Sequence, residues 1–194
     1  KIASFELIDL PLIKYVASTG KPMILSTGMA DVREIQEAID AAHEGGCKEL
    51  AILHCVSGYP APAEDYNLRI IPDMIERFGL VTGLSDHTLD NTTAITSIAM
   101  GASIIEKHFT LDRNNGGPDD SFSLEPEELK NLCKDSKTAW ESLGRISYER
   151  KKSEQGNSVF RRSLYAVQDI KAGEIFTKEN VKSIRPGFGV PPKF

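Results

Sequence analysis

The chain has 194 residues, of which 40% are hydrophobic and 26% are charged, which is typical of an ordinary soluble globular protein. The net charge is −5 and no basic stripe is present, so we expect no nucleic-acid partner. No apolar stretch approaches the roughly 20 residues that span a bilayer, and no signal-peptide pattern is present, so we expect no membrane partner.

The three cysteines, Cys47, Cys55 and Cys133, are odd in number and widely spaced. This argues against a disulfide framework and predicts a cytoplasmic protein. The first residues already read as a strand, and the last ones follow shortly after a new unit begins. We therefore expect a piece of a longer protein, and we expect such a piece to be inactive on its own.

Short strand-like runs alternate with stretches of helical period along the first three-quarters of the chain. The strands are expected at residues 2–5, 22–26, 50–54, 80–84 and 103–108. Apolar residues at helical spacing predict helices after each run. Asp31 is a candidate N-cap of the second helix, and Gly79 ends the third. This alternation is typical of a parallel sheet, open or closed into a barrel.

The character of the sequence changes after residue 143, which suggests three parts. Residues 1–143 carry the strand–helix alternation, and residues 144–158 are polar and read as a linker. Residues 159–194 read as short strands with turns at 171–173 and 186–187, the start of a small β-rich domain.

Each predicted strand turns polar at its carboxyl end, where α/β barrels carry their active sites. The polar residues at these ends are Ser4, Glu6, Ser26, Thr27, Ser57, Ser85, His87, Glu106 and His108. So many polar strand ends in register indicate a ligand site. The hydroxyls are either simple loop caps or donors for phosphate or carboxylate oxygens.

His87 and His108 follow consecutive strands, so they are expected to be neighbours. Side chains alternate along a strand, so Ser85 shares a face with His87, and Glu106 shares one with His108. If that face lines the interior, two imidazoles converge beside a carboxylate, a donor set that suits an open divalent-metal site. The residues alone are equally compatible with two unrelated core histidines.

Several further residues have rival interpretations. Lys107 could form a Schiff base, although alternation directs it away from His108, toward the helices. Cys55 and His54 are adjacent, so their side chains diverge, and a structural cysteine is the favoured interpretation. The long loop at 110–126, which contains Asp119, has no hydrophobic period, and loops of this length tend to be functional or disordered. The arginines near the end, Arg185 included, are read as surface charge by default.

A series of motifs resembles the sialic acid synthases, in order and over essentially the whole chain. The segments are "KIASFELIDLPLIKYVASTGKPMILSTGMA", "SGYPAPAEDYNL", "GLSDHTLD", "IIEKHFTLDR", "GGPDDSFSLEPEEL" and "RPGFG". That family condenses phosphoenolpyruvate with an N-acetylated sugar to give nine-carbon 2-keto acids. The resemblance implies a (β/α)8 TIM barrel, here strands four to eight, followed by the start of a small β-rich antifreeze-like (SAF) domain.

Within this family the chain looks most like the pseudaminic acid synthase branch, because of "GGPDDSFSLEP" and "NVKSIRPGFG". That branch uses 2,4-diacetamido-2,4,6-trideoxy-L-altrose. The neuraminate branch, which uses N-acetylmannosamine, usually has Asn where Ser57 stands, and it remains a competing hypothesis. His54 departs from the Lys often seen in the pseudaminate branch. A Schiff-base aldolase and a non-catalytic sugar-binding module are two more distant hypotheses.

The resemblance also implies roles for individual residues. His87 and His108 would be catalytic ligands of Mn²⁺ or Mg²⁺, and Glu106 and Asp119 would be acids able to move a proton. The residues that would hold phosphoenolpyruvate are Lys1, Ser4, Ser26, Ser57, Tyr59 and Ser85. Phe160 and Arg185 would complete the sugar site, with Arg185 reaching a partner subunit. This implies a domain-swapped homodimer.

Overall fold

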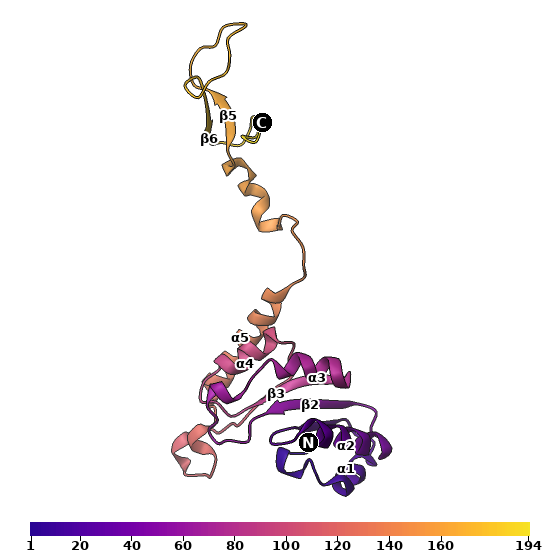
Figure 1. Ribbon diagram of the computed structural model, residues 1–194. Helices are drawn as coiled ribbons and strands as arrows, with labels where there is room; N and C mark the ends of the chain where they lie inside the picture. Colours follow the sequence, from indigo (N-terminus) through magenta and orange to yellow (C-terminus); the bar gives the residue numbers. More distant parts are fainter. The chain divides into compact units, whose positions relative to one another are not determined.

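The computed structural model describes residues 1–194 and divides them into two units, Lys1–Gly144 and Arg145–Phe194 (Figure 1). The first unit is built on one parallel sheet whose strands follow chain order. The strands are β1 (Met23–Ser26), β2 (Leu50–Cys55), β3 (Val81–Asp86) and β4 (Ile105–Lys107). This curled sheet is part of an α/β barrel, the predicted fold class.

Helices alternate with the strands in the predicted order. They are α1 (Leu10–Ala17), α2 (Val32–Glu44), α3 (Ile70–Phe78), α4 (Thr92–Ala99) and α5 (Pro126–Leu143). The parallel register pairs Cys55 with Ser85 and Ser85 with Glu106. The carboxyl ends of neighbouring strands therefore meet at one edge of the sheet, as a candidate site requires.

Local sequence signals explain where the helices begin and end. Asp31 and Glu34 form a capping box at the start of α2, as the N-cap prediction requires. Gly79 ends α3 with φ of 64°, a left-handed conformation that favours glycine. At the start of α5, Glu125 and Glu128 form a second capping box. A cap of this kind stabilises its helix by about 1 kcal/mol.

The predicted strand at 2–5 is wrong except for its first residue. Ile2 forms a single parallel bridge to Leu25, and the chain then turns through the 3-10 segment Ser4–Glu6. The physical reason is the nearby start of α1, where the Asp9 side chain accepts a hydrogen bond from the Leu12 backbone N–H. If the strand continued past Ile2, too few residues would remain for the chain to turn before α1 begins at Leu10.

The remaining strand predictions differ from the structure only at their boundaries. β3 extends to Asp86, while the strand expected at 103–108 is reduced to Ile105–Lys107. Beyond β4, a bridge between Phe109 and Leu124 pins the long loop at 110–126 to the sheet. The loop contains two 3-10 turns, Arg113–Asn115 and Asp120–Phe122. It is thus an ordered wall beside the strand ends.

The main apolar cluster lies between β1, β2 and the helices α1 and α2, and every residue of β2 is buried. A strand buried on both faces is typical of a parallel sheet covered by helices. Gly83 allows β3 to approach its neighbours closely. A Cβ there would lie 2.4 Å from the Ile104 carbonyl oxygen and 2.7 Å from Leu53 Cδ2.

The second unit contains an antiparallel pair, β5 (Ser163–Ala166) and β6 (Val181–Ile184). It also contains 3-10 turns over Lys152–Phe160, which overlap the stretch read as a linker. All three cysteines of the chain are free. No helix in the structure has the length and apolar character needed to cross a membrane.

Candidate active site

A cavity of about 380 Å³ opens at the carboxyl ends of the strands of the first unit. It brings together most of the residues that the sequence singled out there. The wall consists of Lys1, Ala3, Ser4, Ser26, Cys55, Tyr59, Ser85, His87, Glu106, Lys107 and His108. Ser85, His87, Glu106 and His108 share one cavity wall, as predicted, but Lys107, which was expected to face the helices, also contributes to that wall.

His87 and His108 are neighbours, with ring centroids 5.2 Å apart. The Nδ1 atom of His108 lies 3.5 Å from Asp119 Oδ2, so the loop carboxylate stands beside this ring. Metal–nitrogen bonds are about 2 Å long, and two rings at this spacing can share one ion. No group of three or more His, Cys, Asp or Glu side chains in this chain is arranged to hold a metal.

The surroundings of His87 leave one ring nitrogen free. Its Nδ1 atom lies 2.8 Å from the Val56 carbonyl oxygen, which can only accept a hydrogen bond. Nδ1 therefore carries the proton in the neutral ring, and the Nε2 lone pair is available. Burial lowers the pKa of His87, which favours this neutral form. Metal-binding histidines are typically oriented in this way.

Glu106 forms the charged centre of the cavity. Its carboxylate accepts two hydrogen bonds from Lys1 Nζ, at 2.6 and 2.8 Å, and one from Ser85 Oγ at 2.8 Å. Burial on its own would raise the pKa of Glu106, but the Lys1 ammonium and the Ser85 hydroxyl outweigh it, so the pKa is lowered. The carboxylate is thus ionised and able to accept a proton, while it fixes the Lys1 amine at the cavity wall.

Ser4, Ser26 and Ser57, from three different segments, form a polar cluster that we call the serine corner. Ser4 Oγ accepts a hydrogen bond from the Gly28 backbone N–H at 3.0 Å. The hydroxyls of Ser26 and Ser57 are buried without any hydrogen-bond partner in the structure. Buried polar groups are nearly always paired, so we expect a water molecule or a bound ligand to complete these two hydroxyls. Ser57 does not line the cavity itself but lies behind Gly28.

Gly28 explains how these hydroxyls come so close to the backbone. A Cβ at this position would lie 2.3 Å from Ser57 Oγ and 2.8 Å from Ser4 Oγ. Glycine leaves this space without any shift of the two hydroxyls, a feature that sequence reasoning missed because it depends on three segments meeting. The "STG" after β1 was the available signal.

An aromatic cluster closes one side of the cavity. The Tyr59 ring lies 4.3 Å from His87 and 5.7 Å from His108, between centroids. Phe122, from the loop at 110–126, lies 5.1 Å from His108 and 5.8 Å from Tyr59. Burial and nearby acidic groups raise the pKa of Tyr59, so the phenol stays protonated. Phe122 was missed from the sequence, although it is the only aromatic residue in that loop.

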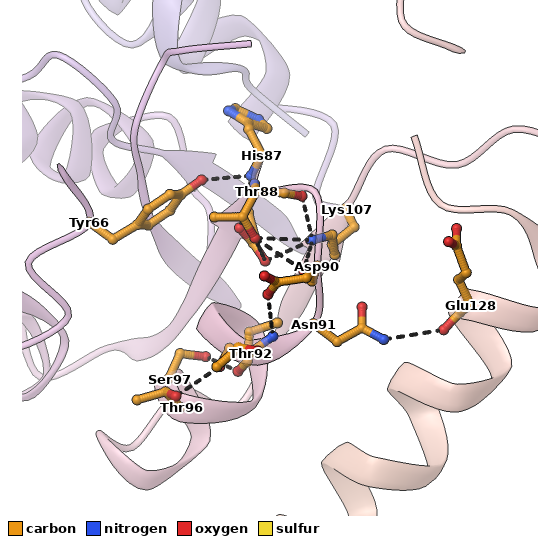
Figure 2. A network of polar contacts seen from close by, with 12 residues as sticks. Tyr66, His87, Thr88, Asp90, Asn91, Thr92, Thr96, Ser97, Lys107 and Glu128 are labelled. Carbon is orange, nitrogen blue, oxygen red and sulfur yellow. Dashed lines mark hydrogen bonds and ion pairs between the residues drawn. The ribbon is translucent and has the colours of Figure 1, made fainter. Parts of the chain in front are cut away.

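Lys107 is held away from the reaction space, although it contributes to the wall. Its amine contacts Asp86 Oδ2 at 2.9 Å and the carbonyl oxygens of Thr88 and Asp90 at 2.8 and 2.7 Å (Figure 2). The Lys107 side chain is 3% exposed. An amine with this many acceptors is a poor Schiff-base nucleophile, which weighs against an aldolase of that type.

His54 and Cys55 do not form a nucleophile–base pair. The Nε2 atom of His54 lies 2.5 Å from the Tyr66 carbonyl oxygen, and burial lowers the pKa of this imidazole. Cys55 faces the cavity, whereas His54 does not. The divergence expected from strand alternation is therefore present.

Phe160 and Arg185 lie in the second unit. Both line a cavity of about 460 Å³ in that unit, together with Arg161 and Arg162. Arg162 donates to the Ser183 carbonyl oxygen at 2.7 Å, whereas no such contact holds Arg185. Three arginines therefore make this second cavity cationic.

Comparison with known proteins identifies both parts of the chain. The model of the NeuB family matches residues 1–148, which include the whole cavity. The chain belongs to the NeuB family. The model of the SAF domain matches residues 161–194, as NeuB-type synthases followed by an antifreeze-like domain would predict.

Curated NeuB relatives carry different product names. The N,N'-diacetyllegionaminic acid synthase of Campylobacter jejuni is 43% identical over 98% of this chain, and it is matched over 58% of its own length. A pseudaminic acid synthase of Campylobacter jejuni is 42% identical over 100% of the chain and 57% of its own length. The chain thus spans less than two-thirds of these NeuB proteins.

Solved NeuB structures show the same fold. The N-acetylneuraminic acid synthetase of Leptospira borgpetersenii superposes with a TM-score of 0.74 at 35% identity. The match covers 80% of this chain and 54% of that one. The near-equal identities to the legionaminate and pseudaminate enzymes leave the sugar to be argued separately.

Proposed function

We propose that the protein condenses phosphoenolpyruvate with an N-acetylated amino sugar, giving a nonulosonic acid and phosphate. The observation that carries the proposal is the cavity itself. It combines Lys1 and the unpaired hydroxyl of Ser26 with two adjacent imidazoles, one of them presenting a free Nε2 atom. The lysine and the serine hydroxyl suit a phosphorylated acid, and the two imidazoles suit a divalent cation beside a carbonyl.

The chemistry balances with water as the only further reactant. The C3 atom of phosphoenolpyruvate forms a bond to the aldehyde carbon of the open-chain sugar, and the aldehyde oxygen becomes a hydroxyl by taking up a proton. Water adds at C2, and the C2–O bond to the phosphate breaks. The resulting 2-keto acid and inorganic phosphate contain all atoms of the two substrates and the water.

Lys1 and the serines are proposed to bind phosphoenolpyruvate. The Lys1 ammonium, whose charge is paired with Glu106, supplies N–H donors, and Ser4, Ser26, Ser57 and Ser85 supply hydroxyl donors. Tyr59 lies on the histidine side of the same cavity, where its ring can pack against the substrate.

His87 and His108 are proposed to hold Mn²⁺ or Mg²⁺, which when bound would polarise the sugar aldehyde and orient it. Glu106 is ionised and is proposed to take a proton from the water that adds at C2. Asp119 stands beside His108, at the edge where the sugar would enter, and is proposed as the second acid.

For the sugar we propose 2,4-diacetamido-2,4,6-trideoxy-L-altrose, with N-acetylmannosamine as the second candidate. The segment "GGPDDSFSLEP" and Ser57, which stands where the neuraminate branch usually has Asn, support this choice. Arg185 and Phe160, which share a pocket in the second unit, are proposed to bind the sugar's N-acetyl group in a partner subunit of a domain-swapped homodimer.

The test is a product assay on the full-length native protein that carries this chain. Each sugar is mixed with phosphoenolpyruvate and Mn²⁺, and the 2-keto acid and released phosphate are quantified. We expect product from the altrose derivative, and loss of product in His87→Ala and His108→Ala. Borohydride is expected to trap no adduct. Turnover with neither sugar, or full activity in both histidine variants, would refute the proposal.

A further inference from the structure

Three of the four polar atoms of His87 form hydrogen bonds with neighbouring residues. Its backbone N–H donates to Tyr66 Oη at 2.6 Å, and its carbonyl oxygen accepts from the Ala61 N–H at 3.1 Å. Its Nδ1–H donates to the Val56 carbonyl oxygen at 2.8 Å. All three partners belong to the loop after β2, so only Nε2 is left to face the cavity.

Within this loop, Tyr66 contacts both His87 and the strand β2. It is fully buried, and its carbonyl oxygen lies 2.5 Å from His54 Nε2 on the adjacent strand. Burial and the neighbouring Asp86 carboxylate raise the pKa of Tyr66, so its phenol remains protonated. The Tyr66 hydroxyl accepts from the His87 N–H while the Tyr66 carbonyl oxygen contacts His54, so this one residue links His87 to β2.

On the opposite side of the same strand end, Asp86 and Lys107 form a buried ion pair, with side chains 0% and 3% exposed. Asp86 also accepts from the Thr88 backbone N–H at 2.9 Å and from the Thr88 hydroxyl at 3.1 Å. Lys107 donates to the Thr88 and Asp90 carbonyl oxygens. The residues on both sides of His87 are thus bound to β4, the strand that leads into His108.

Figure 2 shows the consequence for the ring: the imidazole of His87 extends away from Lys107 and the acidic groups, while its backbone is held among them. The pair and the phenol fix the backbone, and Val56 fixes the ring. A completely buried ion pair is costly to form, and this one binds the residues on both sides of His87.

We propose that Tyr66, Asp86 and Lys107 are positioning residues that hold the His87 Nε2 atom toward His108 and thereby set the affinity of this pair for a divalent cation. This inference rests on the proposed function for its cation, but the orientation of His87 exists without one. Groups that orient a metal-binding histidine typically change metal affinity by about 10- to 100-fold when they are removed.

The test uses two variants of the full native protein and one control. Tyr66→Phe removes only the hydroxyl. The double variant Asp86→Asn/Lys107→Met removes both charges together, so no lone charge is buried. The control, Thr82→Val, removes the buried hydroxyl of another β3 residue, which bonds only the Leu80 carbonyl oxygen. Circular dichroism checks that all three remain folded.

The first readout is NMR of the His87 ring nitrogens without metal. We expect the Nδ1–H tautomer with a slowly exchanging proton in the native protein and in Thr82→Val, and faster exchange in Tyr66→Phe and the double variant. The second readout is the dissociation constant for Mn²⁺ alone, which we expect to rise about 10- to 100-fold in those two variants. If Tyr66→Phe and the double variant, both folded, keep the native ring signals, the inference is overturned. Altered ring signals in a protein that binds no Mn²⁺ would support the positioning role and refute the proposed metal instead.

Discussion

Replacing Gly28 by alanine is expected to weaken phosphoenolpyruvate binding while leaving the protein folded. The new Cβ would lie 2.3 Å from Ser57 Oγ and 2.8 Å from Ser4 Oγ, both below the 3.0 Å that real Cβ contacts keep. Both neighbours are side-chain hydroxyls that can rotate, so the fold can absorb the methyl group at a cost of about 1–3 kcal/mol. The displaced hydroxyls are the ones proposed to bind the phosphorylated substrate.

The size of the binding effect follows from what is displaced. A hydrogen bond contributes about 0.5–1.5 kcal/mol net, so two misplaced hydroxyls amount to about 1–3 kcal/mol. At about 1.4 kcal/mol per factor of ten, KM for phosphoenolpyruvate should rise roughly 5- to 150-fold. The value of kcat should change much less, because the histidines and Glu106 are untouched.

Steady-state kinetics with phosphoenolpyruvate as the varied substrate test this expectation. Gly58→Ala is the matched control, because a Cβ there would meet its nearest neighbour, Ala61, at an ordinary 3.5 Å. A native KM in Gly28→Ala, with Gly58→Ala behaving identically, would show that the serine corner does not hold this substrate.

Four further results are expected. Glu106→Gln should lower kcat by about 100-fold, because the ionised carboxylate is lost as a base, and rapid-quench assays of product formation would check this. Phe122→Ala should lower the free energy of unfolding by about 3 kcal/mol in urea melts, whereas Tyr59→Phe should not. Burial lowers the pKa of His54, so its neutral form is favoured on folding; this stability is present above about pH 6.5 and is lost as the pH falls below that value. Urea midpoints at pH 7.5 and 5.5 should therefore differ less in His54→Gln, and an unchanged difference would contradict this. Finally, Mn²⁺ and phosphoenolpyruvate should raise each other's affinity by one common factor, measurable by calorimetry.

The fold could largely be predicted because its signals are local. Hydrophobic period, the Asp31 cap and Gly79 each act within a few residues, so the order of strands and helices followed from the sequence. The error at residues 2–5 has the opposite origin. Ile2 and Phe5 look like strand residues, but the turn into α1 decides their conformation, and Phe5 is exposed. Tertiary context overrides propensity in so short a segment.

The same distinction between local signals and tertiary context applies to the residues of the candidate site. Residues at strand ends, such as His87 and Glu106, could be found because alternation and parallel register bring them to one edge. Tyr66 could not, because it reaches His87 from a loop that no periodicity describes. The close approach of Ser57 to Gly28 likewise arises only when separate βα units pack together.

The charge of the cavity explains why cation and phosphorylated substrate should support each other. Lys1 is neutralised by Glu106, Lys107 is neutralised by Asp86, and burial favours an uncharged His87. The wall therefore offers almost no net positive charge, in a chain whose net charge is −5. A multiply charged anion would enter such a cavity at a high desolvation cost unless a divalent cation between the histidines supplied the missing charge. The hydroxyls can direct the phosphate oxygens, but they cannot balance their charge, so occupancy of the histidine pair should control how tightly the serine corner binds.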